Sequence, residues 1–311
     1  CWLLVQLGRK LGLTLQQALW VSFAFLFASP YIGVAYFSLN SYVSHVVTTT
    51  WLLGSLDEFF GKRLYWLIGI LMGFALVTRV TAGVGIMFYF LSIVFDQIFS
   101  RTRFNLHKIL AVVRDLMYLL TPYAACVIFL GWYNYIRFGN PLETGYSYAI
   151  LTGWLANARN LGIFSLLHVP RNLYHFLLAL PRLNVDKVGA LHFPYIQIYG
   201  TGMSILVTSW YLPIFLFTDF TEWFNQKIVL TVLAILTPLL LLFSTGVWQF
   251  GYRFALDFLP FMFILFIYSI ARKRIMLTRS LKSIIVLSAF FNLYLVVFGS
   301  FPLFALLFGQ K

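Results

Sequence analysis

Two opposite charges, Arg253 and Asp257, lie four residues apart where a polar, aromatic stretch (residues 248–253) runs into a long apolar segment. Only 10% of the 311 residues are charged, and 61% are hydrophobic. A charge near hydrocarbon is costly, so it usually faces a protein interior or a wet cavity and often marks a functional site. An α-helix would place both residues on one face, where they could pair or bind a ligand. Two interpretations remain open, a structural ion pair and direct contact with a ligand.

Arg79 interrupts another apolar stretch, with Thr78 before it and Thr81 after it. Its guanidinium could bind a phosphate through two parallel hydrogen bonds, with the threonine hydroxyls as further donors. The alternative is an interfacial arginine whose charge reaches water at the membrane border. His45 lies at the start of a further apolar segment, where a single polar residue is more often packed than catalytic.

A Gly139-Asn140-Pro141 turn ends a third apolar segment and is followed by Glu143 and Tyr146. Aromatic residues with hydroxyl groups suit the faces and edges of sugars, and they equally suit the aromatic belt at a membrane surface. The candidate substrate-binding residues are therefore Arg79, Arg253, Asp257, Glu143, Tyr146 and His45. The catalytic residue and any metal ligands are not assigned.

The elements that would position these residues are membrane helices. The mean hydropathy is +0.87, and apolar runs of about 15–22 residues recur along the chain, where a span needs roughly 20. The runs are continuous rather than alternating, which predicts helices and not a β-barrel. We expect an all-α fold, a polytopic transmembrane helical bundle that forms one domain over residues 1–311. The expected spans lie near 1–8, 17–34, 41–56, 64–78, 82–98, 112–134, 200–218, 228–245, 254–271 and 283–300.

The stretch 64–98 is too long for one span, and its polar residues at 78–81 predict a hairpin of two short helices. With this hairpin, most basic residues fall on one side, which we expect to be cytoplasmic. These residues are Arg9, Lys10, Lys62, Arg63, Arg101, Arg103, Lys108, Arg114, Lys227, Arg272, Lys273, Arg274, Arg279 and Lys282. The acids at that border, expected to be solvated, are Asp57, Glu58, Asp96, Asp115, Asp219 and Glu222.

The candidate residues then lie on the extracytoplasmic side, together with a long loop from about 137 to 200. Within this loop, residues 171–181 place Leu173, Phe176, Leu177 and Leu180 on one helical face. This pattern predicts a short helix in the membrane interface, with an ordinary buried loop helix as the alternative.

Several function classes find no support in the sequence. The net charge of +13 reflects Lys and Arg at membrane borders rather than a basic stripe on a polar domain, so nucleic acid is not an expected partner. The sequence contains no nucleotide-binding loop, zinc pattern or nucleophile elbow. Cys1 and Cys126 lack metal-ligand spacing, and no structural disulfide is expected from them.

Five short motifs in order carry a family resemblance. They are Leu7-Gly-Arg-Lys-Leu-Gly-Leu-Thr, Phe27-Ala-Ser-Pro, Gly73-Phe-Ala-Leu-Val-Thr-Arg-Val-Thr, Arg137-Phe-Gly-Asn-Pro-Leu-Glu-Thr-Gly-Tyr and Gly251-Tyr-Arg-Phe-Ala-Leu-Asp-Phe-Leu-Pro. Over residues 1–270, the chain resembles bacterial integral-membrane glycosyltransferases of the GT-C class. The closest branch is the one related to protein O-mannosyltransferases and lipid A aminoarabinose transferases. Val80 departs from this pattern, which has proline there.

The resemblance implies an enzyme of the bacterial inner or plasma membrane. It would move a sugar from a polyprenyl-phosphate carrier to a lipid, glycan or protein acceptor on the extracytoplasmic face. In this family an acid in the first extracytoplasmic loop acts as the general base. We expect that loop to precede residue 1, because the chain begins without Met and resembles the end of a helix. No cofactor is certain, although a divalent metal is possible in this class.

In such an enzyme Arg79 and Arg253 would stabilise the departing phosphate, with Asp257 holding Arg253 in place. Glu143 and Tyr146 would shape the acceptor side. The alternatives are a polytopic transporter or lipid flippase and a non-catalytic membrane protein. A transporter would need polar groups near the bilayer midplane and often carries an internal repeat, and neither is visible in the sequence.

Overall fold

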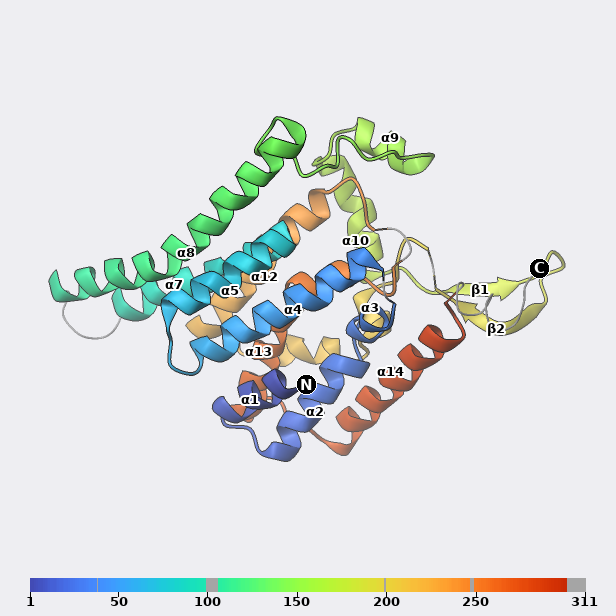
Figure 1. The fold of residues 1–311 in the computed structure, drawn as a ribbon. Helices are drawn as coiled ribbons and strands as arrows, with labels where there is room; N and C mark the ends of the chain where they lie inside the picture. The colour runs from blue at the N-terminus through green and yellow to red at the C-terminus, as the bar shows by residue number, and fades with distance from the viewer. Residues whose placement is uncertain (38, 99–105, 199, 247–248, 301–311) are drawn as a thin grey trace.

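The computed structural model describes residues 1–37, 39–98, 106–198, 200–246 and 249–300 (Figure 1). Arg101 and Arg103 of the expected basic set and Trp248 of the motif around Arg253 lie outside these residues. The fold is mostly helical, with 68% helix and 5% strand. This composition agrees with the predicted class, apart from one small sheet.

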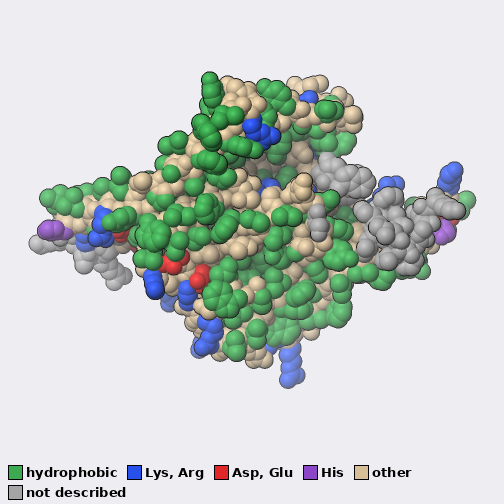
Figure 2. All heavy atoms as spheres, viewed as in Figure 1, with side chains coloured by type: hydrophobic (Ala, Val, Ile, Leu, Met, Phe, Trp, Pro, Cys, Tyr) green, Lys and Arg blue, Asp and Glu red, His purple; other side chains and the backbone are tan. Residues whose placement is uncertain are grey.

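Among the described residues, three helices are long and apolar enough to cross a membrane: α8 (Leu106–Phe138), α12 (Trp223–Leu241) and α14 (Arg279–Val297). α8 leaves much of its apolar surface uncovered, and Ile128 at its middle is 72% exposed. Hydrophobic side chains also spread over the visible face of the whole molecule (Figure 2). Exposed apolar surface of this extent is typical of contact with lipid or another protein.

The first four helices are α1 (Trp2–Lys10), α2 (Leu15–Phe27), α3 (Tyr31–Tyr36) and α4 (Asn40–Phe59). Thr14 and Gln17 form a capping box that starts α2. The prediction of one span over 17–34 was wrong, because the chain breaks between α2 and α3. Pro30, the residue before α3, has no N–H to continue the helix.

The predicted interruption near residue 79 is confirmed. α5 (Tyr65–Thr78) ends where Arg79 adopts an extended conformation, with φ −150° and ψ 110°, and α6 (Val80–Gly83) and α7 (Ile86–Ile98) follow. The Ser55 hydroxyl contacts Met72 Sδ on α5 at 3.4 Å and the Tyr89 hydroxyl on α7 at 2.7 Å. Arg79 lies instead beside the other end of α4, as described below. The chain therefore reverses after α5, as a hairpin requires.

α5 and α8 pack closely because glycines on α5 face α8. A Cβ added at Gly69 would collide with the backbone oxygen of Leu119 and lie 2.7 Å from Pro122 Cγ. A Cβ at Gly73 would lie 2.5 Å from the sulfur of Cys126. The two helices thus approach at a distance that only glycine permits. Both cysteines of the chain are free.

The long segment between α8 and α12 contains short elements. A short helix is present where one was expected, as α10, with Pro170 in its first turn. It ends at Leu177, so Leu180 of the predicted apolar face lies beyond it. Its place in a membrane interface stays a prediction. An antiparallel pair of strands was not predicted. The elements in order are α9 (Trp154–Asn160), η1 (Leu166–His168), α10 (Val169–Leu177), β1 (Arg182–Val185) and β2 (Leu191–Gln197).

Two further predicted spans are broken in the structure. The region 200–218 contains only α11 (Ile205–Thr208) and η2 (Leu212–Phe217), so the expected continuous span there was wrong. The region 254–271 is divided into η3 (Arg253–Asp257) and α13 (Leu259–Ala271). Pro260 occupies the first turn of α13, where its missing N–H costs nothing.

α13 forms the centre of the hydrophobic core. Its aromatic side chains Phe261, Phe263 and Phe266 are fully buried. Phe263 packs edge-on against Phe25 of α2, and Phe261 contacts Phe88 of α7. α13 therefore joins the N-terminal helices to the α5–α7 hairpin, and η3 enters this core directly before it.

Acidic residues at the end of α4 opposite His45 and on neighbouring elements pair with Lys or Arg. Four of the predicted border acids take part, through Lys10–Asp57 at 2.8 Å, Arg114–Asp115 at 2.9 Å, Lys227–Asp96 at 2.6 Å and Arg274–Asp219 at 2.9 Å. Lys227 has a buried side chain, but its partner Asp96 keeps 44% of its side chain exposed, so this acid is partly solvated as expected. Asp115 is buried, so the prediction that it is solvated was wrong. The basic residues and these acids lie together, as the sequence indicated.

Candidate functional site

The Asp257 carboxylate is fully buried and lies at the centre of a polar cluster. Arg79 donates from Nε to Oδ1 at 2.6 Å and from Nη2 to Oδ2 at 2.9 Å. The Thr81 hydroxyl donates to the same Oδ2. Two parallel N–H···O bonds to one carboxylate are the strongest geometry available to an arginine. Arg79 and Asp257 therefore form one neutral, rigid unit.

This arrangement corrects the predicted brace between Asp257 and Arg253. The prediction assumed an α-helix, in which residues four apart share a face. Residues 253–257 instead form a 3₁₀-helix, in which residues three apart eclipse and the fourth lies roughly 120° away. Asp257 consequently points to Arg79, which lies at the break between α5 and α6. Arg253 points in a different direction.

Arg253 points toward the first turn of α4. Its Nη1 donates to Ser41 Oγ at 3.2 Å, and its guanidinium lies 5.1 Å from the ring centre of Tyr42. Its Nε is buried without a hydrogen-bond partner among the described residues. Among the described residues, no carboxylate lies within ion-pair distance of Arg253. A buried cation with an unused donor can bind an anion.

The ring of Phe254 contacts both arginines. The guanidinium carbon of Arg79 is 5.4 Å from the ring centre, and that of Arg253 is 5.5 Å from it. Both are within the range of a cation–π contact. Since Asp257 balances only one of the two guanidiniums, the cluster keeps one positive charge in excess. An anion such as a phosphate would complete it.

His45 is packed against this cluster and has no solvent-exposed surface. Its Nδ1 lies 3.5 Å from Asp257 Oδ1, and its ring stacks on Phe254 with 5.9 Å between ring centres. The position corresponds to the packed alternative for this residue. His45 fills the space behind the Arg79–Asp257 pair.

Tyr146 approaches the cluster, whereas Glu143 has a local role. Glu143 Oε1 accepts from the backbone N–H of Gly145 at 2.6 Å, so it orders the turn after α8. Hydrogen bonds, first of all from the Ser147 hydroxyl, hold the pKa of Glu143 below its ordinary value. Tyr146 packs edge-on against Phe243 and lies within electrostatic range of Arg253.

Sequence reasoning missed Ser41 and Tyr42, which contact Arg253. It expected the Thr81 hydroxyl to donate to a phosphate, whereas this hydroxyl donates to Asp257. A signal for the first two was present. Ser41 and Tyr42 lie four and three positions before His45 on α4, so both share a helix face with His45. The partner of Asp257 carried no such signal, because Arg79 is 178 residues away in sequence.

The residues present do not form a site for the possible divalent metal. Across the described ranges, no group of three or more His, Cys, Asp and Glu side chains comes together. Both oxygens of Asp257 are already engaged by Arg79 and Thr81. We therefore assign no step to a metal at this cluster.

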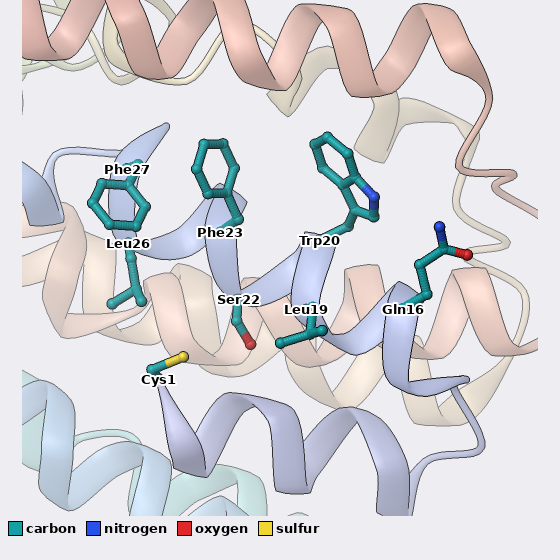
Figure 3. Close-up of a pocket in the computed structure, with 8 residues that line it drawn as sticks. All are labelled: Cys1, Gln16, Leu19, Trp20, Ser22, Phe23, Leu26 and Phe27. Atoms are coloured by element: carbon teal, nitrogen blue, oxygen red, sulfur yellow. The ribbon is translucent and has the colours of Figure 1, made fainter.

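Hollows elsewhere on the surface differ in chemistry. A groove of about 400 Å³ along α2 has mostly apolar walls, including Leu19, Trp20 and Phe23 (Figure 3). None of the candidate residues lines it. The visible face is also hollowed between the region of α9 and the body of the molecule, and a basic side chain is visible inside (Figure 2).

Comparisons of the chain with protein-family models, with curated protein sequences and with solved structures each gave no match. The function is therefore argued from the Arg79–Asp257 pair, the neighbouring Arg253 and the resemblance carried by the five motifs.

Proposed function

We propose that the chain belongs to a polytopic membrane glycosyltransferase that uses a polyprenyl-phosphate sugar as its donor. The acceptor would be a lipid, glycan or protein on the extracytoplasmic face. The observation that carries this proposal is the buried guanidinium of Arg253, which has no carboxylate partner within the described residues and one unused donor. A cation held in this way is suited to a phosphate monoester or diester.

In the proposed reaction, an acceptor oxygen forms a bond to the anomeric carbon of the sugar. The bond from that carbon to the carrier phosphate oxygen breaks, and the phosphate leaves with the electron pair. Negative charge then grows on the phosphate oxygens, where the fixed N–H groups of Arg253 stabilise it more strongly than in the donor. The proton of the acceptor passes to a base.

Asp257 is not that base in our proposal. Its two oxygens accept hydrogen bonds from Arg79 and Thr81, and its side chain is fully buried. A general base must reach the proton that it removes. Asp257 and Arg79 instead hold Phe254 and the start of η3 in place, so that Arg253 keeps its orientation.

α4 separates the cluster from the basic border. It has 20 residues, with His45 beside the cluster near one end and Asp57 paired to Lys10 near the other. The 12 positions from His45 to Asp57 extend about 18 Å, at 1.5 Å per residue. In the proposed topology the cluster faces the extracytoplasmic side, and the basic border at the other end of α4 faces the cytoplasm.

Transfer assays with the full-length protein in vesicles would test the proposal. The vesicles would receive polyprenyl phosphates carrying labelled mannose, glucose or aminoarabinose, and label in the acceptor fraction would be measured. We expect transfer from one of these donors, and a loss of about 100-fold or more in Arg253→Ala, as for other fixed donors that face developing charge. Arg137→Ala is the matched control, since Arg137 is exposed at the end of α8. Equal loss in both variants, or none in Arg253→Ala, would contradict the assignment.

A further inference from the structure

A further pocket lies in the segment between α8 and α12. It has a volume of about 360 Å³, and its walls include Trp154, Asn157, His168 and Arg171 together with three aliphatic side chains. This volume is near the lower end of the range of small-molecule sites, about 300–1,000 Å³. An aromatic ring with several polar groups around it is the usual composition of such a site.

Arg171 is held rigidly in the wall of this pocket. Its Nη2 donates to the backbone oxygen of Phe243, and its guanidinium carbon lies 4.6 Å from the ring centre of Trp154. Its Nε is buried without a hydrogen-bond partner among the described residues. The rest of the guanidinium lies in the pocket wall, where a ligand oxygen can accept a hydrogen bond from it.

The other polar groups offer complementary contacts. The Asn157 side chain is exposed, and its amide makes no hydrogen bond to the described part of the chain. His168 is buried and fixed by a 2.9 Å contact from Nε2 to the backbone oxygen of Gly162. Trp154 remains 41% exposed, so its ring has accessible surface although Arg171 stacks on it.

We infer that this pocket binds a pyranose ring of the acceptor. The face of an aromatic ring carries partial negative charge and attracts the C–H groups on one side of a sugar ring. The guanidinium and the amide can then bind the hydroxyl groups at the edge of the sugar. A purely apolar ligand would leave both groups unsatisfied. The role of this sugar as the acceptor rests on the proposed function, whereas binding of a pyranose does not.

The position of the pocket fits an acceptor subsite. Arg171 binds the backbone of Phe243, and the ring of Phe243 contacts Tyr146. Tyr146 in turn lies within electrostatic range of Arg253. Arg171, Phe243 and Tyr146 thus lead from the pocket to the neighbourhood of the arginine that we assign to the carrier phosphate. A glycan seated on Trp154 would thus extend toward the proposed reaction centre.

Saturation-transfer NMR on the full-length protein would test this inference. The detergent would be dodecylphosphocholine, because a detergent with a sugar headgroup would compete with the probes for the pocket. The probes would be the methyl α-pyranosides of glucose, mannose and galactose. We expect binding of at least one probe, with about tenfold or greater loss of affinity in Trp154→Ala and partial recovery in Trp154→Phe. Trp66→Ala, which changes an exposed tryptophan outside the pocket, should bind like the wild type.

The inference is overturned if no pyranoside binds, or if Trp154→Ala and Trp66→Ala bind alike. Contact of detergent acyl chains with Trp154 that no pyranoside displaces would also overturn it. The proposed function is judged separately. If transfer depends on Arg253 but acceptor KM is unchanged in Trp154→Ala, the pocket is not the acceptor subsite. If pyranosides bind at Trp154 but no donor is used, the pocket stands and the transferase proposal fails.

Discussion

Arg79 and Asp257 are 178 residues apart in sequence, yet the guanidinium donates two hydrogen bonds to the carboxylate, at 2.6 Å and 2.9 Å. Their pairing ties the break between α5 and α6 to the 3₁₀-helix that precedes α13. It also leaves Arg253, the other arginine beside Phe254, without a carboxylate partner among the described residues. The charge excess of the cluster, and with it the proposed phosphate site, follows from this one pairing.

Removing the Asp257 carboxylate should strongly destabilise the fold. Asp257→Ala leaves two arginines around Phe254 without a counter-charge, and breaking a buried ion pair costs about 3–5 kcal/mol. Thermal unfolding in detergent would measure the loss. Asp186→Ala is the control, because Asp186 forms an exposed pair with His192 at 2.8 Å, where little change is expected. Equal stability of the two variants would show that the buried pair is not a structural unit.

The contact of α5 with α8 predicts a difference between two glycines. Gly69→Ala should cost about 1–3 kcal/mol, as overpacking usually does, because its Cβ would meet the backbone of Leu119. Gly54→Ala in α4 has only an ordinary contact, with Leu71 Cδ1 at 3.8 Å. It should be neutral or stabilise by roughly 0.5–1 kcal/mol, since alanine favours a helix. Chemical unfolding of both variants would check the order. The opposite order would mean that the helices do not approach closely.

The buried side chain of Asn172 should stabilise the end of α12, which precedes the segment that carries Arg253. Its buried amide donates to the backbone oxygens of Leu239, Leu240 and Leu242, at 3.3, 2.7 and 2.7 Å, and so caps the end of α12. Asn172→Ala should lower the free energy of unfolding by about 1–3 kcal/mol, because these buried backbone oxygens would lose their hydrogen bonds. Amide hydrogen exchange near residues 239–246 should become faster in Asn172→Ala. It should not change in Asn160→Ala, because the side chain of Asn160 is exposed. Unchanged exchange in Asn172→Ala would remove this capping role.

His175 predicts loss of stability in mild acid. Burial, with Arg171 nearby, lowers the pKa of His175 below its ordinary value of 6.5. The folded state therefore binds the proton more weakly than the unfolded state does. The stability from neutral His175 is complete above pH 6.5 and falls as the pH decreases toward the folded-state pKa. Unfolding at pH 7.5 and 5.5 should differ less in His175→Gln than in the wild type. The same difference in both proteins would exclude His175 as the cause.

The sequence predicted the helical class and the break at Arg79, because polar residues stood out against an apolar background. It did not predict that Arg253 and Asp257 diverge, since their spacing was interpreted for an α-helix and 3₁₀ geometry separates them. Hydropathy could not distinguish a span from the short helices over 200–218, because both are apolar. The hairpin of β1 and β2 had a signal at Asp186-Lys187-Val188-Gly189, where Gly189 adopts φ +86°.

Pairing across long separations could not be inferred from one sequence. The Trp154 pocket depends on Arg171 reaching Phe243, 72 residues later, and the Asp257 cluster depends on Arg79. In both cases the residues were visible, but their partners were set by how α12, η3 and α5 pack. The predicted partner of Asp257 was therefore wrong, whereas the predicted break at Arg79 was confirmed.

The most direct test of the central claim is the affinity of the full-length protein for farnesyl phosphate, which supplies the phosphate and a short isoprenoid chain. Isothermal titration in vesicles would compare the wild type with Arg253→Ala and Arg137→Ala. If Arg253 binds the carrier phosphate, its loss should weaken binding by about tenfold or more, since a hydrogen bond to a charged group contributes roughly 1.5–3 kcal/mol. Arg137→Ala should bind like the wild type. Equal affinity of Arg253→Ala and the wild type would contradict the account.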